Sequence, residues 1–345
     1  MEFEYKPEYT LTPEMLDLVV EITKHLTKLD HVSNLLKQPQ LRRINRLRTI
    51  HSSCAIEGNT LTLEQVTAVI NGKTVLAPQN EILEIKNAFE AYKLLEEINP
   101  FEIKDMLKVH GVMMKDLVHE AGRFRTHNVG IYNNKGEIAH VAPPPGNVAP
   151  LTYKLYDWVK TEKVNELIKY SIFHYEFEFI HPFNDGNGRM GRFMQSAFLS
   201  KWNPLFAYLP VETIIKERQQ QYYDALAAQG SVHSTGSYKA FQDCYADGGK
   251  SNCFIVYMLT AILDSVKNIH NESGNLIKSQ TAQVQKLMEV MLHTPLSAKE
   301  IADRLNIKSM ASLKKNYLDP ALKLGLITMT DPDKPTSNKQ KYFRI

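Results

Sequence analysis

Residues 181–192 read His-Pro-Phe-Asn-Asp-Gly-Asn-Gly-Arg-Met-Gly-Arg and bring together the side chains that phosphoryl or nucleotidyl transfer requires. His181 can take a proton from an attacking hydroxyl near neutral pH. Asp185 can hold Mg²⁺ against a polyphosphate, and Arg189 and Arg192 can neutralise the charge of phosphate oxygens. The glycines between them let backbone N–H groups approach those oxygens. The run therefore predicts a phosphate-binding loop with a general base at its start.

The same glycines allow a second interpretation. Gly186, Gly188 and Gly191 also satisfy the dinucleotide pattern G-x-G-x-x-G. Residues 177–180 alternate like a short strand, and Glu212 lies where an acidic ribose partner would be sought. However, a Rossmann loop follows its strand directly, and the chain lacks the repeated strand–helix alternation of a doubly wound sheet. The P-loop pattern G-x-x-x-x-G-K-S/T does not occur in the sequence. We therefore favour a loop between two helices.

Two helices are expected to hold this loop. Apolar residues recur at three- and four-residue steps up to Phe179 and cover nearly every face, which is typical of a buried central helix. That helix would end at His181, and a second helix is expected from about Arg189 to Trp202. Phosphates would then lie at the N-terminus of the second helix, where free N–H groups and the helix dipole favour anions.

A hairpin and a proline run precede the central helix. Residues 129–132 and 138–141 are predicted to be short strands around the turn residues Asn133 to Gly136. Residues 143–145 are all proline, which predicts that no helix follows directly.

The N-terminal region is predicted to be helical. Residues 41–56 carry a helical apolar pattern that stops at residues 57–59, and Thr62 with Gln65 forms a capping box for the next helix. From this pattern alone, the segment is an amphipathic helix that ends at Gly58.

The tail from about residue 278 has the pattern of a winged-helix module. It holds twelve Lys and Arg against six Asp and Glu over residues 274–345, a net +6, while the rest of the chain is about −3. This asymmetry allows DNA binding, but winged helices also serve as interaction or packing modules, and the expected reading helix has lysines without an arginine suited to guanine. The expected elements are helices over 283–293, 298–305 (after the N-cap Ser297) and 309–324, and strands over 326–329 and 341–345.

Composition excludes several classes of protein. Lys and Arg exceed Asp and Glu by only 41 − 38 = 3, which argues against a general affinity for nucleic acid or membranes. Cys54, Cys244 and Cys253 are too few and too scattered for a disulfide framework or a zinc site. The N-terminus has no apolar leader, and no run of about 18 apolar residues occurs. We therefore expect a soluble, cytoplasmic protein of two or three domains.

The run at 181–192 resembles the Fic motif, H-P-F-x-D/E-G-N-G-R-x-x-R, at every specified position. The resemblance implies a mainly α fold, with a Fic-type helical core and a small β-hairpin flap, joined to the C-terminal winged-helix domain. It implies transfer of AMP from ATP to a Ser, Thr or Tyr hydroxyl of a target protein, which could be the chain itself, with Mg²⁺ as cofactor and the target docked on the flap. His181 would be catalytic and Asp185 the metal ligand. The implied nucleotide-binding residues are Glu57, Ile138, Ala139, His140, Asp185, Gly186, Asn187, Gly188, Arg189, Met190, Gly191, Arg192, Tyr222 and Tyr223.

Residues 53–58 read Ser-Cys-Ala-Ile-Glu-Gly and resemble the inhibitory motif of many Fic proteins, S/T-x-x-x-E-G/N. By this resemblance Ser53, Glu57 and Gly58 are regulatory, and Glu57 pairs with Arg192. While it is so paired, Arg192 cannot hold the γ-phosphate, so ATP would bind in a pose unfit for transfer.

The tyrosine pair Tyr222-Tyr223 resembles one that contributes to the nucleoside pocket of Fic proteins. An adjacent pair on a helix is otherwise one core and one surface residue. Some relatives place an asparagine seven residues after the second tyrosine, whereas this chain has Gly230 there, after Gln229. This difference leaves the base contact open.

The expected domains are residues 1–95 with the inhibitory helix, 96–270 as the Fic core and 278–345 as the winged helix. Other functions stay open: Fic relatives also transfer UMP, phosphate or phosphocholine, and some remove AMP. The intact residues 186–189 favour AMP transfer. From another class, the chain could be a DNA-binding regulator whose Fic core only senses ATP. A second copy of the chain is a further candidate partner, and no membrane partner is expected.

Overall fold

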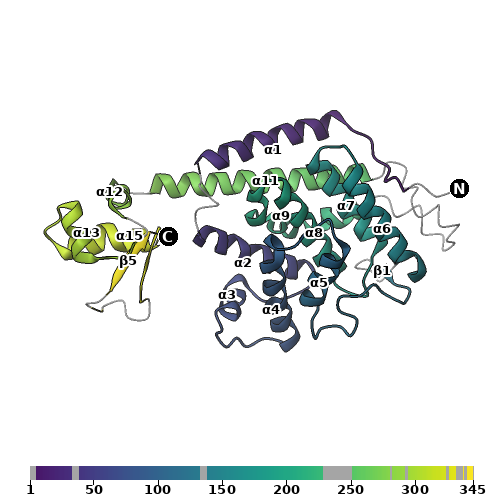
Figure 1. The fold of residues 1–345 in the computed structure, drawn as a ribbon, viewed down its shortest axis with the longest axis horizontal. Helices are drawn as coiled ribbons and strands as arrows, with labels where there is room; N and C mark the ends of the chain where they lie inside the picture. The colour runs from purple at the N-terminus through teal and green to yellow at the C-terminus, as the bar shows by residue number, and fades with distance from the viewer. Residues whose placement is uncertain are drawn as a thin grey trace. The chain divides into compact units, whose positions relative to one another are not determined.

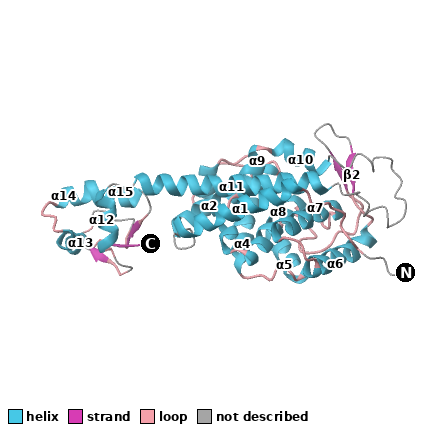
Figure 2. Ribbon diagram, turned by 90° about the horizontal axis from the view of Figure 1, so that it is seen from above, coloured by secondary structure: helices cyan, strands magenta, loops and turns pink. Residues whose placement is uncertain are grey.

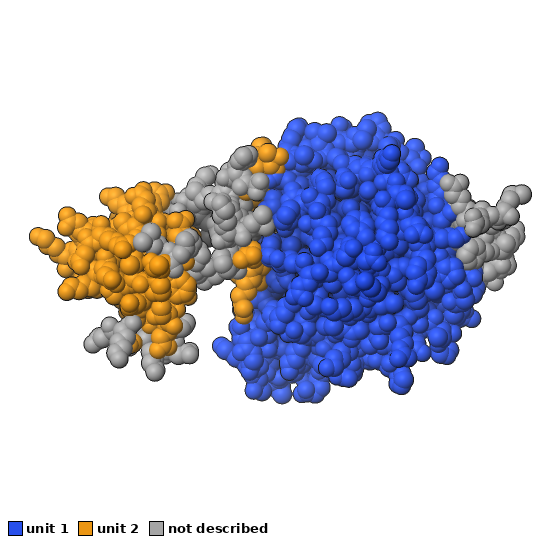
Figure 3. All heavy atoms as spheres, in the orientation of Figure 1, with its two compact units in different colours: residues 1–26, 45–267 blue, residues 27–44, 268–345 orange. Residues whose placement is uncertain are grey.

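The structure is a computed structural model that describes residues 5–32, 39–132, 138–227, 251–279, 282–291, 294–323, 326–331, 337 and 340–344. The chain forms two compact units (Figure 3). Unit 1 consists of residues 1–26 and 45–267, and unit 2 of residues 27–44 and 268–345. Helices α1 (Pro13–Val32), α2 (Pro39–Ile56) and α11 (Ser251–Ser279) contribute residues to both units.

Unit 1 is helical apart from one hairpin, as far as its residues are described (Figures 1 and 2). The mainly α fold class is therefore confirmed. Helices α7 (Glu166–Ile180) and α8 (Asn187–Trp202) pack against each other, and α6 (Pro145–Thr161) packs against α7. The other described helices of this unit are α3 (Leu63–Ile70), α4 (Gln79–Lys93), η2 (Leu94–Glu96), α5 (Ile103–Met113), η3 (Pro204–Tyr208), α9 (Val211–Glu217) and α10 (Gln219–Ala227).

Helix α7 is the central helix predicted from the sequence. The Asn165 side chain caps its start by accepting a hydrogen bond from the N–H of Leu167 at 3.0 Å. Twelve of its fifteen residues are buried, so the apolar pattern reflects a helix enclosed on nearly all sides. Residues 177–180 belong to this helix, and the interpretation of them as a strand of a dinucleotide fold is therefore wrong.

The hairpin consists of β1 (Gly130–Tyr132) and β2 (Ile138–Val141), which pair antiparallel with Ile131 opposite His140. Both strands lie where the sequence predicts them. The predicted turn at residues 133–136 lies outside the described residues.

The prediction that no helix follows the proline run is wrong. Helix α6 begins at Pro145, directly after the N-cap residue Pro144, and contains Pro150 as well. In its first turn a helix has no internal partner for the N–H group, so the lack of that group in proline costs nothing there, and its fixed φ suits the helix. Val148, Leu151 and Leu155 are buried and hold the helix in the core.

The inhibitory-motif segment forms the end of α2. The helix stops at Ile56, and Gly58 has a φ of 97°, a left-handed conformation that favours glycine. The predicted capping box of α3 is present, because the Thr62 side chain accepts from Gln65 N–H and the Gln65 side chain accepts from Thr62 N–H.

Among the described residues from 282 onward, unit 2 contains three helical segments and a small sheet. Strand β5 (Lys341–Arg344) pairs antiparallel with both β3 (Leu296–Ser297) and β4 (Ile327–Met329). The helical segments are α12 (Ala282–Val290), α13 (Ala298–Leu305) and the run of α14 (Met310–Leu313), η6 (Lys314–Leu318) and α15 (Asp319–Lys323). The core of the unit includes Val284, Leu287, Ile301, Leu313, Leu318, Ile327 and Tyr342.

The helix predicted over 309–324 is not a continuous α-helix. Residues 314–318 form a π-helical turn just before Pro320. Proline has no N–H to donate to the carbonyl four residues earlier, here that of Asn316, which favours a wider turn. Ser297 caps α13 as predicted, with Glu300 completing a capping box.

None of the described helices is long and apolar enough to cross a membrane. Cys54 is a buried free thiol, and Cys244 lies outside the described residues.

Candidate functional site

The loop of residues 181–187 joins the end of α7 to the start of α8. Gly186 precedes α8 with a φ of 83°, a left-handed conformation that favours glycine, and a Cβ there would lie 2.7 Å from Met114 Sδ, so the methionine would have to shift. Asn187 closes the loop, because its amide nitrogen donates to Phe183 O and its amide oxygen accepts from Phe183 N–H, both at 2.8 Å. The first N–H groups of α8 are therefore available to bind a ligand at this loop.

His181 is the residue at which α7 ends, with a left-handed φ of 52°. Its Nδ1 lies 3.3 Å from the carbonyl oxygen of Glu178, and because a carbonyl can only accept, the contact places the proton on Nδ1 and leaves Nε2 as an acceptor. Burial lowers the pKa of His181, and the Arg125 charge acts in the same direction, against the carboxylates of Glu178 and Glu57. The ring is therefore a neutral base at neutral pH.

Arg125 fixes the backbone of this turn and was not found from the sequence. Its side chain donates to four carbonyls, those of His127, Pro143, Ile180 and His181, the last from Nε at 2.7 Å. The guanidinium is buried, so these bonds replace water at its donors. Arg125 thus connects the end of α7 with both sides of the hairpin.

His110 of α5 supports the loop from below and was also missed. Its ring stacks on Phe183 with a centroid separation of 3.6 Å and an interplanar angle of 5°. Gly122 N–H donates to Nδ1 at 2.8 Å, so Nε2 carries the proton and donates to the carbonyl of Asp185 at 3.0 Å. Burial lowers the pKa of His110 to about 4, which keeps this tautomer neutral. A single histidine among apolar residues of a helix was the available signal.

Arg192 is in the second turn of α8, and its side chain is bonded to residues at the end of α2 and just after it. Its Nη2 donates to Glu57 Oε1 at 2.7 Å and to the Ser53 carbonyl at 3.1 Å, and its Nε lies 3.3 Å from Ser53 Oγ. The Arg192 side chain is 1% exposed and that of Glu57 30%. Burial lowers the pKa of Arg192, but the charge and hydrogen bond of Glu57, together with Tyr222 and Glu178, outweigh burial, so the pKa is raised and the guanidinium keeps its charge.

Glu57 lies directly against the glycine loop. A Cβ added to Gly188 would collide with Glu57 Oε1 and would lie 3.1 Å from Arg192 Nη1. That Nη1 is buried and has no hydrogen-bond partner among the described residues. The carboxylate of Glu57 therefore contacts both the glycine loop, at Gly188, and Arg192.

Arg189 is the second cation of the site. Its Nη1 pairs with Glu84 Oε1 and its Nη2 with Asp185 Oδ1 at 3.0 Å. The Asp185 side chain is 57% exposed, and its Oδ1 also accepts from Gly186 N–H at 2.5 Å. Among the described residues, no group of three or more His, Cys, Asp and Glu side chains could hold a metal ion. A cation here would rely on one protein carboxylate.

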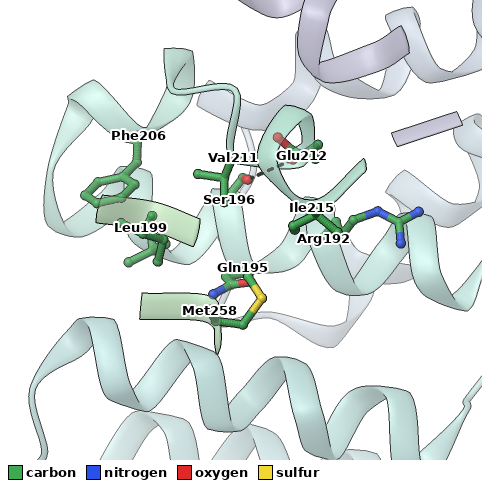
Figure 4. Close-up of a pocket in the computed structure, with 10 residues that line it drawn as sticks. Arg192, Gln195, Ser196, Leu199, Phe206, Val211, Glu212, Ile215 and Met258 are labelled. Carbon is green, nitrogen blue, oxygen red and sulfur yellow. Dashed lines mark hydrogen bonds between the residues drawn. The ribbon is translucent and has the colours of Figure 1, made fainter. Parts of the chain in front are cut away.

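A small cavity lies behind Arg192 (Figure 4). Its walls come from α8, α9 and α11 together with Phe206, and the Arg192 guanidinium points away from the other lining side chains. Glu212 is buried there, where its Oε1 accepts from Tyr92 and Ser196, and burial raises the pKa of its carboxyl. The proposed ribose partner of the dinucleotide interpretation is thus an internal residue of the core.

The tyrosine pair divides into a core and a half-buried residue. Tyr222 is buried, with its hydroxyl 3.1 Å from His174 Nε2, and Tyr223 donates to the carbonyl of Ile56 at 3.2 Å. Of the predicted flap residues, only the strand pairing of 138–140 is described. Gln229 and Gly230 lie outside the described residues.

The structure thus brings together His181, Asp185, Arg189, Arg192 and Glu57 at one loop, although Glu57 is 135 residues from Arg192 in the chain. Ser53 and Gly58 flank this contact on the same segment, as the motif implies. Met190 and Gly191 are on α8 but buried within the core. The Gly191 position faces α7, since a Cβ there would lie 3.0 Å from His174 Nε2.

Comparisons with known proteins give the family. A model described as Fic/DOC family matches residues 100–199, and one described as Filamentation induced by cAMP protein Fic-like, C-terminal domain, matches residues 282–344. The crystal structure of a Fic family protein from Desulfovibrio desulfuricans G20 is similar over 99% of this chain and 98% of that chain, with 40% identity and a TM-score of 0.70. The chain belongs to the Fic family.

Several relatives of this Fic chain bear the name protein adenylyltransferase Fic. The one from Drosophila willistoni is 28% identical over 257 residues, which are 70% of this chain and 48% of that protein. The one from Drosophila mojavensis is 30% identical over 243 residues, 64% of this chain and 45% of that protein. The chain thus spans less than half the length of these curated relatives.

Proposed function

We propose that this Fic chain transfers AMP from ATP to a hydroxyl group of a target protein. The observation that carries the proposal is the placement of a neutral histidine, His181, at the mouth of a glycine loop that holds Asp185, Arg189 and Arg192. The names of the relatives support the reaction type.

The polyphosphate of ATP would lie over residues 186–188, at the start of α8. Buried donors without a hydrogen-bond partner among the described residues, Arg189 Nε and Arg192 Nη1, support an anion in this place. The helix N-terminus adds free N–H groups and favourable partial charge. Tyr223 and residues 138–140 are proposed to border the nucleoside, and buried Tyr222 to support that border from the core.

Asp185 fits Mg²⁺, because its carboxylate is exposed and lies beside the phosphate loop. Mg²⁺ usually takes one or two protein carboxylates and completes its shell with substrate phosphates and water. When bound, the ion neutralises phosphate charge. Asp185 Oδ1 accepts hydrogen bonds from Arg189 and from Gly186 N–H. To bind Mg²⁺, Asp185 would have to give up these bonds or use its other carboxylate oxygen.

In the proposed reaction, His181 Nε2 takes the proton of the target hydroxyl. The freed oxygen attacks the α-phosphorus of ATP, a new phosphoester bond forms, and the bond to pyrophosphate breaks. Arg189 and Arg192 hold the β- and γ-phosphates as negative charge collects on them. Most of the rate enhancement comes from positioning and charge stabilisation, which are the main contributions in phosphoryl transfer. The target is proposed to align along the β1–β2 flap, so that its hydroxyl reaches the histidine.

We further propose that Glu57 inhibits the chain in the described conformation. Its carboxylate takes Arg192 and covers Gly188, so a γ-phosphate and Glu57 compete for one guanidinium. The site would become active when α2 moves or Glu57 turns away.

Three proteins test the proposal: the natural chain, Glu57→Gly and His181→Ala, each incubated with α-labelled ATP, Mg²⁺ and a cell extract. We expect label on protein to rise with Glu57→Gly and to vanish with His181→Ala. Label that survives His181→Ala would refute the mechanism, and no gain on losing Glu57 would refute the inhibition. Release of AMP from a labelled target by the natural chain would instead favour AMP removal.

For unit 2 we propose a winged-helix module that binds DNA, a second function alongside transfer. The supporting observation is the net +6 of residues 274–345, together with Lys299 and Lys308, which line a groove over α13 and the start of α14 beside Asp303. Binding of the full chain to DNA should weaken steeply as salt is raised from 50 to 200 mM, on the order of tenfold or more. Absence of binding at the lowest salt would refute this role.

A further inference from the structure

Both arginines of the α8 motif are paired with a carboxylate from the N-terminal helices. Arg192 has Glu57, and Arg189 has Glu84 of α4, 105 residues away in sequence. The paired side chains of Arg189 and Glu84 are 8% and 13% exposed. Glu84 lies outside both sequence motifs, residues 53–58 and 181–192, so neither motif explains its ion pair with Arg189.

The second oxygen of Glu84 bonds the turn that follows α2. Asn59 Nδ2 donates to Glu84 Oε2 at 2.7 Å and to the carbonyl of Glu81 at 3.1 Å. Thr60 adds two bonds to Glu81 Oε2, from its N–H at 2.6 Å and its hydroxyl at 2.8 Å. Each oxygen of Glu84 therefore has a different partner: a motif arginine on one side and the turn after the inhibitory helix on the other.

The two carboxylates around Arg189 fix the plane of its guanidinium. Glu84 takes Nη1 and Asp185 takes Nη2, so both terminal nitrogens of a rigid planar group are held. Keeping a charge on Glu84 is unfavourable, because burial raises the pKa of this carboxyl while Arg189 and Asn59 counteract it. A buried carboxylate in this position is expected when it orients a functional cation.

We propose that Glu84 is a positioning residue of the transfer site, which orients Arg189 for the phosphates and couples it to the turn that follows Glu57. The proposal rests on the proposed function. Movement of the inhibitory segment would therefore change the contacts of both arginines. It would act on Arg192 directly through Glu57, and on Arg189 through Asn59 and Glu84.

The test uses the full chain with Glu57→Gly, so that direct inhibition is absent. In this Glu57→Gly background we compare Glu84→Gln, Arg189→Ala and the double variant. Glu84→Gln keeps an acceptor for Asn59 but removes the charge facing the arginine. We expect it to lower kcat/KM for ATP about 10- to 100-fold, as a misplaced binding group does. Adding it to Arg189→Ala should change little, because Glu84 acts through that arginine.

Glu81→Gln is the matched control, since Glu81 bonds the same turn from the same helix but pairs with neither arginine of the motif. It should leave kcat/KM within about twofold. If the effects of Glu84→Gln and Arg189→Ala multiply, or if Glu84→Gln matches the control, the positioning role is refuted. Calorimetric affinities for ATP with Mg²⁺ on the same variants, with the same pattern expected, keep this test separate from a failure of AMP transfer.

The coupling is tested in the chain that retains Glu57. Asn59→Ala breaks the link to Glu84 but leaves the ion pair with Arg189 in place. We expect AMP transfer to rise at least about 3- to 10-fold, because the turn loses the bonds of Asn59 to Glu84, to the Glu81 carbonyl and to Leu61 N–H. In the Glu57→Gly chain the same change should have no such effect. An equal effect in both chains would refute the coupling.

Discussion

Removing the carboxylate of Glu57 is the most informative perturbation of this chain. The carboxylate forms a charge-assisted hydrogen bond of 2.7 Å with Arg192, whose side chain is 1% exposed. In the proposed competition, a γ-phosphate has to displace Glu57 before Arg192 can hold the nucleotide. The strength of this bond would then set the degree of inhibition.

Hydrogen bonds to charged groups contribute about 1.5–3 kcal/mol, and about 1.4 kcal/mol corresponds to a factor of ten. Glu57→Gly should thus raise kcat/KM for ATP about 10- to 150-fold. Glu57→Gln retains an oxygen that accepts from Arg192, and since neutral hydrogen bonds are roughly half as strong, it should raise kcat/KM by about 3- to 10-fold. The order of the variants, Gly above Gln above the natural chain, follows from the geometry.

Stability should change in the opposite direction. Arg192 keeps the Ser53 carbonyl as a partner but loses its carboxylate, so Glu57→Gly should lower the free energy of unfolding by about 1–3 kcal/mol. Added ATP with Mg²⁺ should restore more of the thermal midpoint in this variant than in the natural chain, because the phosphates replace the lost anion.

The assay pairs initial rates of labelling with thermal unfolding, with and without nucleotide. Glu64→Gln is the matched control, because Glu64 is exposed in the first turn of α3. Equal rates for Glu57→Gln and Glu64→Gln, or a nucleotide shift of the midpoint that is no larger in Glu57→Gly, would contradict the competition between Glu57 and phosphate.

Three further outcomes follow from the site. Burial lowers the pKa of His181, and its neutral form is the base, so transfer by Glu57→Gly should be flat above pH 6.5 and fall only at lower pH; a pH–rate midpoint above 6.5 would contradict this. Gly191→Ala places a Cβ 3.0 Å from His174 Nε2 and should cost about 1–3 kcal/mol in urea unfolding, whereas Gly146→Ala, with open space around it, should not. His110 binds a proton more readily when unfolded, so its contribution to stability should be lost as pH falls from 6.5 toward about 4; His110→Leu should remove that slope in thermal midpoints.

The sequence predicts best what depends on residues three or four positions apart. The capping box at Thr62 and the N-cap at Ser297 are present, and α7 lies where its apolar steps place it, because each is decided within one or two helical turns. Pro145 was misjudged, since proline was treated as a helix breaker although it suits the first turn. The π-helical turn before Pro320 requires a choice between helix types that no periodicity reveals.

The residues that support the loop could not be predicted in this way. Arg125, His110 and Glu84 reach it from segments 56 to 105 residues away. Nothing in the neighbourhood of Arg125 or Glu84 distinguishes them from surface residues, and His110 is marked only as a single histidine among apolar residues. The contact of Glu57 with Arg192 was expected only because a family motif implied it. Local sequence carries the chemistry of the loop, whereas its rigidity comes from distant side chains.

The single guanidinium of Arg125 has a consequence for the choice of acceptor. It binds carbonyls at the end of α7, beside His181, and carbonyls of His127 and Pro143 at the two feet of the hairpin. Because the group is planar and inflexible, the separation between hairpin and histidine is set by covalent geometry and not by loop length. If a target strand lies along the hairpin, the side chain that spans this gap must have a matching length. Selection between a short serine and a long tyrosine acceptor would then depend on the residues at the base of the hairpin that bond Arg125.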